Sequence, residues 1–308
     1  MTTLFLTHEI GLEHITPEGH PERPDRLRAI WAALEHDNFA PLVRKQASRA
    51  ADESVLLAHP QAFLDRVRGK IPETGLSIID ADTVASPRSF EAAMTAIGGA
   101  LDAVDAVFEE EADNAFVAMR PPGHHAESNR AMGFCLFNQA AIAARYAQER
   151  HGAERIAIVD WDVHHGNGTQ DIFFHDPSVI YCSTHQMPLY PGTGERGEVG
   201  AGNIVNAPLS TGDAGDHFRE AFRTRVLPAL ENMRPDLIII SAGFDAHYRD
   251  PLAEINLVID DFDWATGKLM DIADDSANGR IVSLLEGGYD LVGLAESTAA
   301  HVTRLMRG

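Results

Sequence analysis

Asp162, His164 and Asp245 are of the right types to hold a metal ion. Asp162 and His164 are separated by one residue, so on an extended segment their side chains point the same way and can bind one ion. Asp245 follows a separate apolar run and is the candidate third ligand. Two carboxylates and one imidazole leave an open position for water, as a catalytic zinc site requires. Fe(II), Co(II) and Mn(II) accept the same ligands, so the sequence leaves the native metal open.

Two adjacent histidines, His124 and His125, could supply acid–base chemistry. They follow two prolines that stiffen the chain and a glycine that permits a tight turn. Held near a metal, two neighbouring imidazoles can act as general base and general acid close to neutral pH. Each ring needs a partner that fixes its tautomer, and we expect Asp160 for one and Asn167 for the other.

Tyr289 is the candidate hydrogen-bond donor to a developing oxyanion. It follows two glycines, which let the backbone turn closely and bring the phenol inward. A metal ion and a phenol together would polarise an amide carbonyl and stabilise a tetrahedral intermediate. The combined pattern therefore predicts metal-assisted hydrolysis of an amide.

Short apolar runs precede all of these residues and alternate with segments of helical period. This alternation predicts a single α/β domain with a mostly parallel sheet covered by helices on both faces. The carboxyl ends of such strands form the ligand site, and four of the runs end beside a titratable residue. The predicted strands are Leu4–Thr7, Ala115–Ala118, Arg155–Val159, Val179–Ser183, Leu237–Ser241 and Ile281–Leu285, and the predicted helices are Arg26–Leu34, Phe90–Phe108, Gln139–Glu149, Ala214–Met233, Phe262–Ala273 and Leu294–Met306.

Composition narrows the classes of function. The 308 residues are 44% hydrophobic and contain no linker or repeat, so we expect one domain over residues 1–308. The net charge of −21 disfavours nucleic acid and would favour cationic substrates, although solubility alone also explains it. No apolar run approaches the roughly 18 residues of a membrane span. With two cysteines and no signal-peptide pattern, a cytoplasmic protein is expected, and a homo-oligomer is an open alternative to a monomer.

Five ordered motifs together resemble the zinc-dependent histone deacetylases, within a wider group that includes acetylpolyamine amidohydrolases and arginases. The resemblance runs from about Thr7 through the last helix. It implies the arginase–deacetylase fold, with zinc on Asp162, His164 and Asp245 and hydrolysis of an N-acyl amine, often acetyl-lysine. The motifs are Arg120–His125, Gly133–Asn138, Asp160–Gly168, Ser241–Asp245 and Glu286–Tyr289.

The resemblance also implies a narrow substrate tunnel. Phe134 and Tyr190 would form its aromatic walls, and the Gly133 carbonyl would accept a hydrogen bond from the substrate amide. His20 belongs to a loop at the tunnel mouth, and Asp82 is a candidate rim residue that could equally be a plain turn aspartate.

Further implied features are Arg26 and structural potassium. Arg26 would lie behind the active site near an acetate exit, or would simply begin the first helix. Structural potassium would bind at two places, the first formed by Asp160, Asp162, His164, Ser183 and Thr184 and the second by Phe173, Asp176, Val179 and Asn203.

Two departures refine this interpretation. Asn167, where nuclear enzymes have aspartate, and Glu286 before the two glycines are similar to class II members. Polyamine-preferring members carry an acidic gatekeeper where this chain has Leu252, and an apolar gate cannot hold a distal ammonium. Glu254 lies nearby in the sequence and could partly substitute.

Four functions are compared on these residues. The favoured one is an acyl-lysine deacylase acting on proteins or peptides, and the nearest alternative is an acetylpolyamine or small-amide hydrolase. A pseudoenzyme that binds acyl-lysine without turnover is disfavoured because ligands, histidine pair and tyrosine are all present. An arginase-like activity is disfavoured because the positions of a second metal are taken by the histidine pair and Tyr289.

Overall fold

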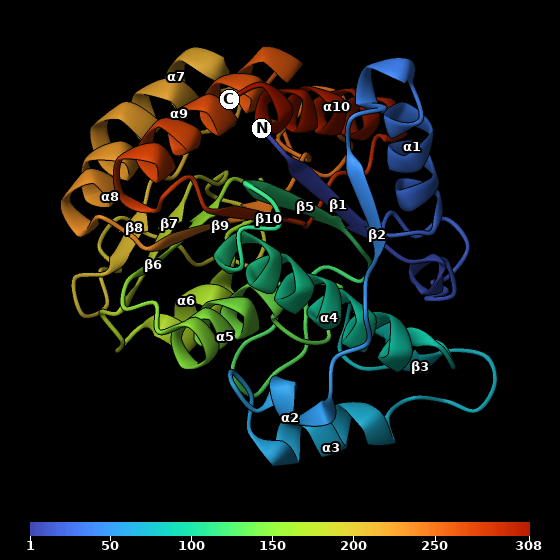
Figure 1. Cartoon of the computed structure of the whole chain (residues 1–308). Helices are drawn as coiled ribbons and strands as arrows, with labels where there is room; N and C mark the ends of the chain where they lie inside the picture. The colour runs from blue at the N-terminus through green and yellow to red at the C-terminus, as the bar shows by residue number, and fades with distance from the viewer.

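The computed structural model describes residues 1–308, and a parallel sheet of eight strands forms its centre. Its strands are β1 (Thr3–Thr7), β2 (Val43–Gln46), β5 (Asn114–Ala118), β6 (Ile156–Asp160), β7 (Val179–Ser183), β8 (Ile204–Asn206), β9 (Leu237–Ala242) and β10 (Ile281–Leu285). Their order across the sheet is β2-β1-β5-β10-β9-β6-β7-β8, with every neighbouring pair parallel (Figure 1). A separate antiparallel pair consists of β3 (Ser77–Ile78) and β4 (Val84–Ala85).

Helices cover both faces of this sheet (Figure 1). One face packs against α1, α7, α8, α9 and α10, and the other against α4 and α5, with α2 and α3 outside α4. The helices are α1 (Asp25–Leu34), α2 (Asp52–Val55), α3 (Gln61–Gly69), α4 (Ser89–Phe108), α5 (Gln139–His151), α6 (Asn167–Phe173), α7 (Gly215–Ala221), α8 (Leu227–Met233), α9 (Ile259–Ser276) and α10 (Leu291–Arg307). Short 3-10 turns occur at Glu9–Leu12 and Asp37–Phe39. None of the helices combines the length and apolar character that crossing a membrane requires.

Burial on both faces explains why the central strands are almost continuously apolar. In β9, Ile238 and Ile240 pack toward the helices of one face, while Leu237 and Ile239 pack toward those of the other. A strand in such a position has no solvent-facing side and needs no alternating polar residues. All six predicted strands are present in the structure, and so is the predicted α/β architecture.

The two strands of the central sheet that were not predicted, β2 and β8, lie at the edges of the sheet, whereas α6, also not predicted, is a short buried helix beside the metal-ligand loop. The side chains of β2 are exposed and mostly polar, and β8 has only three residues, so neither strand has an apolar run. The helix expected over 214–233 is divided by a π-helical turn at Phe222–Val226. Pro228 follows this turn and lacks the N–H that a continuous α-helix would use there.

Candidate active site and metal centre

The predicted site residues lie at the carboxyl ends of four adjacent strands. β5, β10, β9 and β6 are consecutive in the sheet, and the segments after them carry His124, Tyr289, Asp245 and Asp162 in that order. Because parallel strands point the same way, segments far apart in the sequence meet at this one edge.

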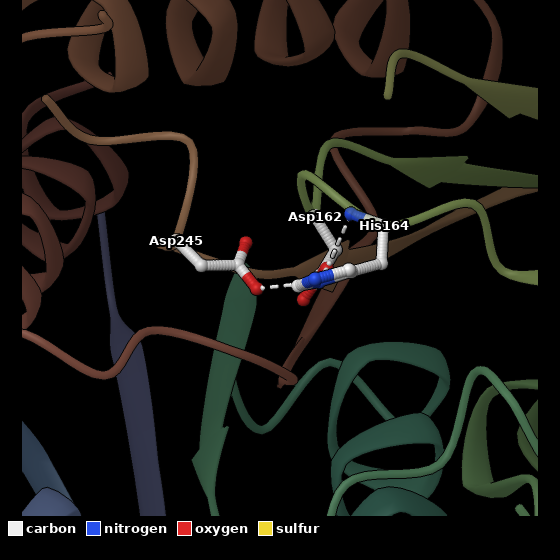
Figure 2. Close-up of side chains that lie close together, drawn as sticks. All are labelled: Asp162, His164 and Asp245. Atoms are coloured by element: carbon white, nitrogen blue, oxygen red, sulfur yellow. Dashed lines mark hydrogen bonds and ion pairs between the residues drawn. The ribbon is translucent and has the colours of Figure 1, made fainter. Parts of the chain in front are cut away.

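Asp162, His164 and Asp245 form a buried cluster of potential metal ligands (Figure 2). One ligand atom of each residue lies within 4.8 Å of the others. Nδ1 of His164 is 3.2 Å from Oδ1 of Asp162 and 3.1 Å from Oδ2 of Asp245. The remaining oxygens are fixed by main-chain donors, since Val163 N donates to Asp245 Oδ1 and Gly287 N to Asp162 Oδ2. Such outer contacts hold ligands ready for an ion.

The local backbone differs from the prediction. Asp162 and His164 are not on an extended segment, because both lie in the bent loop that follows β6. Asp162 N donates to Oδ1 of Asp160, and His164 N donates to Oδ1 of Asp162. An aspartate side chain that accepts a hydrogen bond from the backbone N–H two residues later forms a turn. These turns, rather than an extended segment, bring Asp162 and His164 together.

The surroundings of this cluster fit a divalent cation. Burial and the nearby negative charge of Asp162 raise the pKa of Asp245 to about 7. A bound cation would offset the repulsion between these two carboxylates. The backbone at Gly287 approaches the two carboxylates so closely that no side chain fits between them. A Cβ at Gly287 would lie 2.2 Å from Oδ2 of Asp245 and 2.5 Å from Oδ2 of Asp162. Two carboxylates and an imidazole match the donors of catalytic zinc sites.

His124 and His125 lie side by side, with ring centroids 4.0 Å apart. Nδ1 of His124 is 3.0 Å from Oδ2 of Asp160, and Nδ1 of His125 is 2.8 Å from Oδ1 of Asn167, so both predicted contacts are present. Each partner atom accepts a hydrogen bond, so the proton belongs on Nδ1 and Nε2 is the free nitrogen of a neutral ring.

The pKa values of the two imidazoles are shifted in opposite directions. Burial opposes the cation on His124, but the carboxylates of Asp162, Asp160 and Glu286 outweigh it and raise the pKa of His124 well above its ordinary value. Burial, together with the charges of His124 and His164, lowers the pKa of His125 well below its ordinary value. Neighbouring groups whose pKa values are pushed apart are typical of acid–base pairs.

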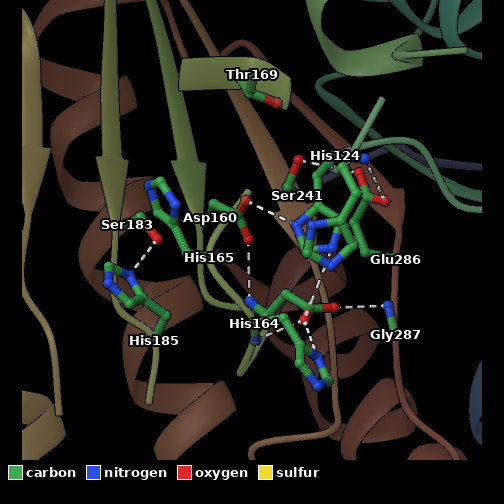
Figure 3. Close-up of polar contacts among 12 residues, drawn as sticks. His124, Asp160, His164, His165, Thr169, Ser183, His185, Ser241, Glu286 and Gly287 are labelled. Carbon is green, nitrogen blue, oxygen red and sulfur yellow. Dashed lines mark hydrogen bonds and ion pairs between the residues drawn. The ribbon is translucent and has the colours of Figure 1, made fainter. Parts of the chain in front are cut away.

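Glu286 is a fully buried carboxylate for which the sequence predicted no role. Its Oε2 accepts from Gly123 N at 2.7 Å and from His124 N at 3.1 Å, and its Oε1 accepts from Ser241 Oγ at 3.1 Å. Figure 3 shows His124 between Asp160 and Glu286. Burial raises the pKa of Glu286 to about 7, although His124 opposes the shift. The sequence could have indicated this role, because Glu286 directly follows the apolar strand β10, and Asp162 follows β6 by two residues.

Tyr289 borders the cluster from the segment after β10. Its backbone N donates to Oδ2 of the largely buried Asp250 at 2.7 Å, and the Arg26 guanidinium lies 5.0 Å from its ring centroid. Burial and the carboxylates of Asp245 and Asp162 raise the pKa of Tyr289 well above its ordinary value, although Arg26 opposes this. The hydroxyl therefore keeps its proton and can donate a hydrogen bond.

A pocket of about 250 Å³ leads to these residues, and we call it the tunnel pocket. His125, His164 and Tyr289 line it together with the aromatic residues Phe134 and Tyr190. The Phe134 ring is 6.0 Å from that of Tyr289, and the Tyr190 ring is 5.2 Å from that of His125. Four further residues complete the lining, namely Asp82, Gly133, Leu189 and Leu252, of which Leu189 was not predicted.

The backbone at Gly133 and Phe134 is in the left-handed region, which is unfavourable for Phe134. Their φ angles are 57° and 67°, in the left-handed region that a phenylalanine rarely adopts. Gly133 N donates to Oδ1 of Asp82 and Phe134 N donates to Oγ1 of Thr83, each at 3.0 Å. Strain of this kind is typical of functional sites, where surrounding contacts enforce it. Asp82 thus anchors the pocket wall as well as lining the pocket.

Comparison with known proteins decides the family. The family model described as "Histone deacetylase domain" matches residues 20–305. The chain belongs to the histone deacetylase family. It is 42% identical to the histone deacetylase-like amidohydrolase of Pseudomonas aeruginosa over 88% of this chain and 73% of that protein. It is 36% identical to a probable deacetylase of Archaeoglobus fulgidus, over 100% of this chain and 87% of the relative.

A solved structure of the same family agrees with the fold. The crystal structure of the HDA15 HD domain superposes with a TM-score of 0.93 at 38% identity, over 99% of this chain and 89% of that one. The chain is accordingly a hydrolase that acts on amide bonds, in a family of deacetylases whose substrates are acylated amines.

Residues in the N-terminal loop lie behind and beside the tunnel pocket of this histone deacetylase family member. The His20 ring contacts that of Phe134, with centroids 4.7 Å apart, but His20 does not line the pocket. Arg26 is the second residue of α1 and also donates from Nε to the carbonyl oxygen of Gly288 at 2.6 Å. Arg26 therefore both belongs to the start of the first helix and lies behind the active-site segment, so the two expected positions are compatible. Glu22, fully buried, accepts from Arg26 and from Arg120, and so connects this loop to the segment that follows β5.

The first expected potassium site shares Asp162 and His164 with the metal cluster. Asp160 accepts from Tyr181 Oη at 2.9 Å, a contact that the apolar strand gave no means to predict. Ser183 Oγ is 2.8 Å from Nδ1 of His185, and the buried hydroxyl of Thr184 has no protein partner.

At the second expected potassium site, three backbone carbonyls converge on one side chain. The amide nitrogen of Asn203 donates to the carbonyl oxygens of Phe173, Asp176 and Val179 at 2.8, 3.0 and 2.8 Å. An amide nitrogen has two protons, so these acceptors exceed its donors.

Proposed function

We propose that this protein is a zinc-dependent deacylase that removes acetyl groups from the lysine side chains of proteins or peptides, with residues 1–308 as one catalytic domain. The observation that carries the proposal is the tunnel pocket. Its walls are aromatic, and His125, His164 and Tyr289 lie together in its lining. An acyl-lysine side chain is long, narrow and uncharged, so it suits a pocket of this size and lining.

Zinc is the metal of this proposal, because two carboxylates and an imidazole are donors that catalytic zinc uses, and Fe(II) or Co(II) would find the same donors. Asp162, His164 and Asp245 would hold it. When bound, the ion would act as a Lewis acid toward the substrate carbonyl and make water a stronger nucleophile.

The histidine pair handles the protons in this proposal. His125, whose pKa is lowered, takes a proton on Nε2 as a water oxygen attacks the amide carbon. Asn167 holds the ring in the required tautomer. His124, kept protonated beside Asp160, stabilises the negative charge, and a proton passes from the pair to the leaving nitrogen as the C–N bond breaks. Acetate and the free amine are the products.

Tyr289 and the pocket walls act on the rest of the substrate. The Tyr289 hydroxyl donates a hydrogen bond to the carbonyl oxygen as negative charge develops there. Phe134 and Tyr190 hold the aliphatic stem, and the Gly133 carbonyl, which accepts from Cys135 Sγ at 3.2 Å, would accept from the substrate amide. Asp82 and His20 support the rim.

Leu252 makes the outer gate neutral. It lines the tunnel pocket, whereas Glu254 does not. A distal ammonium of an acetylated polyamine would find no carboxylate at this gate, which favours acyl-lysine. An acetylpolyamine or small-amide hydrolase remains the second candidate, because Asp82 places one carboxylate in the lining.

Potassium binding and a cytoplasmic location complete the proposal. The first ion would use Asp160, Asp162, His164, Ser183 and Thr184, and the second Phe173, Asp176, Val179 and Asn203. The unpartnered hydroxyl of Thr184 and the converging carbonyls around Asn203 support these two positions. Both cysteines are buried and free, which favours a reducing compartment.

The test compares substrates on the zinc-loaded enzyme. An acetyl-lysine peptide and acetylputrescine are assayed with and without a hydroxamate that competes for the metal. We expect peptide turnover to dominate and to be inhibited by the hydroxamate. A preference for acetylputrescine would keep the chemistry and overturn the substrate assignment, and loss of both activities would overturn the proposal.

A further inference from the structure

A second pocket, of about 230 Å³, lies beside the tunnel pocket, and we call it the cationic pocket. It is formed by the end of α3, the β3–β4 turn and the loop at 129–131. Its floor includes the buried ring of Phe63, and its charged lining residues are Arg66, Lys70, Arg130 and Asp80. None of these residues has a role in the proposed mechanism.

The charge of this pocket is opposite to that of the whole protein. The chain has 25 basic and 46 acidic residues, yet three cationic side chains and one carboxylate line this pocket. A local excess of positive charge on an acidic protein attracts anions selectively, because neighbouring surfaces repel them.

Part of this positive charge is unpaired within the protein. Lys45 pairs with Glu111 and Lys268 with Asp271, whereas Lys70 has no carboxylate within ion-pair distance. Arg130 donates from Nε and Nη2 to Oδ2 of Asp80, which leaves its Nη1 free.

Arg66 is also only partly engaged. Its Nη2 donates to the side-chain oxygen of Asn129 at 2.8 Å and also to its backbone carbonyl, which leaves Nε and Nη1 free. Lys70, Arg66 and Arg130 therefore keep donors for a ligand.

The cationic pocket and the tunnel pocket share two chain segments. Asp80 lines the first and Asp82 the second, and Ala131 lines the first and Gly133 the second. Two residues of extended chain span at most about 7 Å. A peptide with its acyl-lysine in the tunnel pocket can therefore reach the cationic pocket with a residue one or two positions away.

The lining favours a carboxylate on a short aliphatic stem. The guanidinium of Arg66 lies 5.1 Å from the Phe63 ring centroid, so apolar floor and cationic rim adjoin each other. We propose that the cationic pocket binds an aspartate or glutamate of the substrate, one or two residues from the acyl-lysine. This inference rests on the proposed function. It adds a preference for acidic residues beside the acyl-lysine, which the net charge of −21 would not suggest.

The test measures kcat and KM for acetyl-lysine peptides that differ at one position, from two residues before the lysine to two after it. Glutamate is compared with glutamine and lysine at each position. At one position at least, glutamate should lower KM about fivefold relative to glutamine at low salt, with kcat unchanged, because one or two exposed ion pairs contribute about this much. The preference should weaken as salt is raised.

Variants assign the preference to this pocket. Lys70→Gln and Arg66→Gln should each reduce the glutamate preference severalfold, while the exposed Lys268→Gln, which removes the same charge on α9, should keep it. All three should hydrolyse a blocked acetyl-lysine without flanking residues at the wild-type rate. Equal KM for glutamate and glutamine peptides, or a preference that survives both variants, overturns the inference alone. Absence of turnover on every peptide overturns the proposed function as well.

Discussion

Gly133→Ala should displace His125 and reduce turnover. A Cβ at Gly133 would lie 2.3 Å from Cδ2 and 2.5 Å from Cγ of His125, whereas ordinary contact begins at 3.4 Å. The ring must move by about 1 Å, and a misplacement of that size can reduce turnover roughly 100-fold. Alanine at a φ of 57° also destabilises the fold by about 1 kcal/mol.

Gly152→Ala is the matched control for this variant. Gly152 ends α5 with a φ of 69°, and a Cβ at this position would have no other atom within 4 Å. Both variants should lose unfolding free energy in denaturant titrations, Gly133→Ala more than Gly152→Ala because its Cβ also crowds His125, and both should keep zinc. Only Gly133→Ala should lose kcat/KM on an acetyl-lysine peptide. If its kcat/KM stays within threefold of the Gly152→Ala value, the placement of His125 as the proton acceptor is refuted.

Three further predictions follow from individual side chains. Tyr289→Phe should keep its zinc and lose roughly 100-fold or more in kcat, because one oxyanion donor is removed, and near-normal kcat would exclude that role. Glu286→Ala should retain zinc and reduce kcat by roughly tenfold or more, because Gly123 N and His124 N lose their acceptor. Glu286→Gln, which keeps an acceptor, should retain most of the wild-type kcat. Equal losses of kcat in the two variants would contradict this role. Burial lowers the pKa of His301 to about 3, so the unfolded state binds more protons between about pH 3 and pH 6.5 and stability falls as pH drops through that window. In His301→Gln, the slope of unfolding free energy against pH should decrease by up to about 1.4 kcal/mol per pH unit near pH 5, and an unchanged slope would count against a buried neutral histidine.

The central strands and their polar ends were predictable because both follow from one physical cause. A strand buried on both faces must be apolar, so β6 and β9 are visible as runs, and the polar residues after them must lie at one edge. The contacts of His124 with Asp160 and of His125 with Asn167 were predictable because the segments after β5 and β6 meet at that edge. The family resemblance supplied the tunnel residues, which no spacing rule could give.

What the sequence could not supply depends on distant contacts. The edge strand β2 has no apolar pattern because its side chains face solvent. Glu286 binds the backbone of a loop 162 residues away from it in sequence, and Tyr181 reaches Asp160 from inside an apolar strand. The cationic pocket combines three separate segments whose charges are ordinary in isolation.

A metal titration tests the central claim most directly. Metal-free protein receives zinc in steps, and hydrolysis of an acetyl-lysine peptide is measured at each step beside the Asp162→Ala variant. We predict that activity rises linearly to a break at about one zinc per chain, and that the variant neither binds zinc stoichiometrically nor gains activity. Full activity without added metal, or a stoichiometric zinc content in Asp162→Ala, would contradict a catalytic zinc at this site.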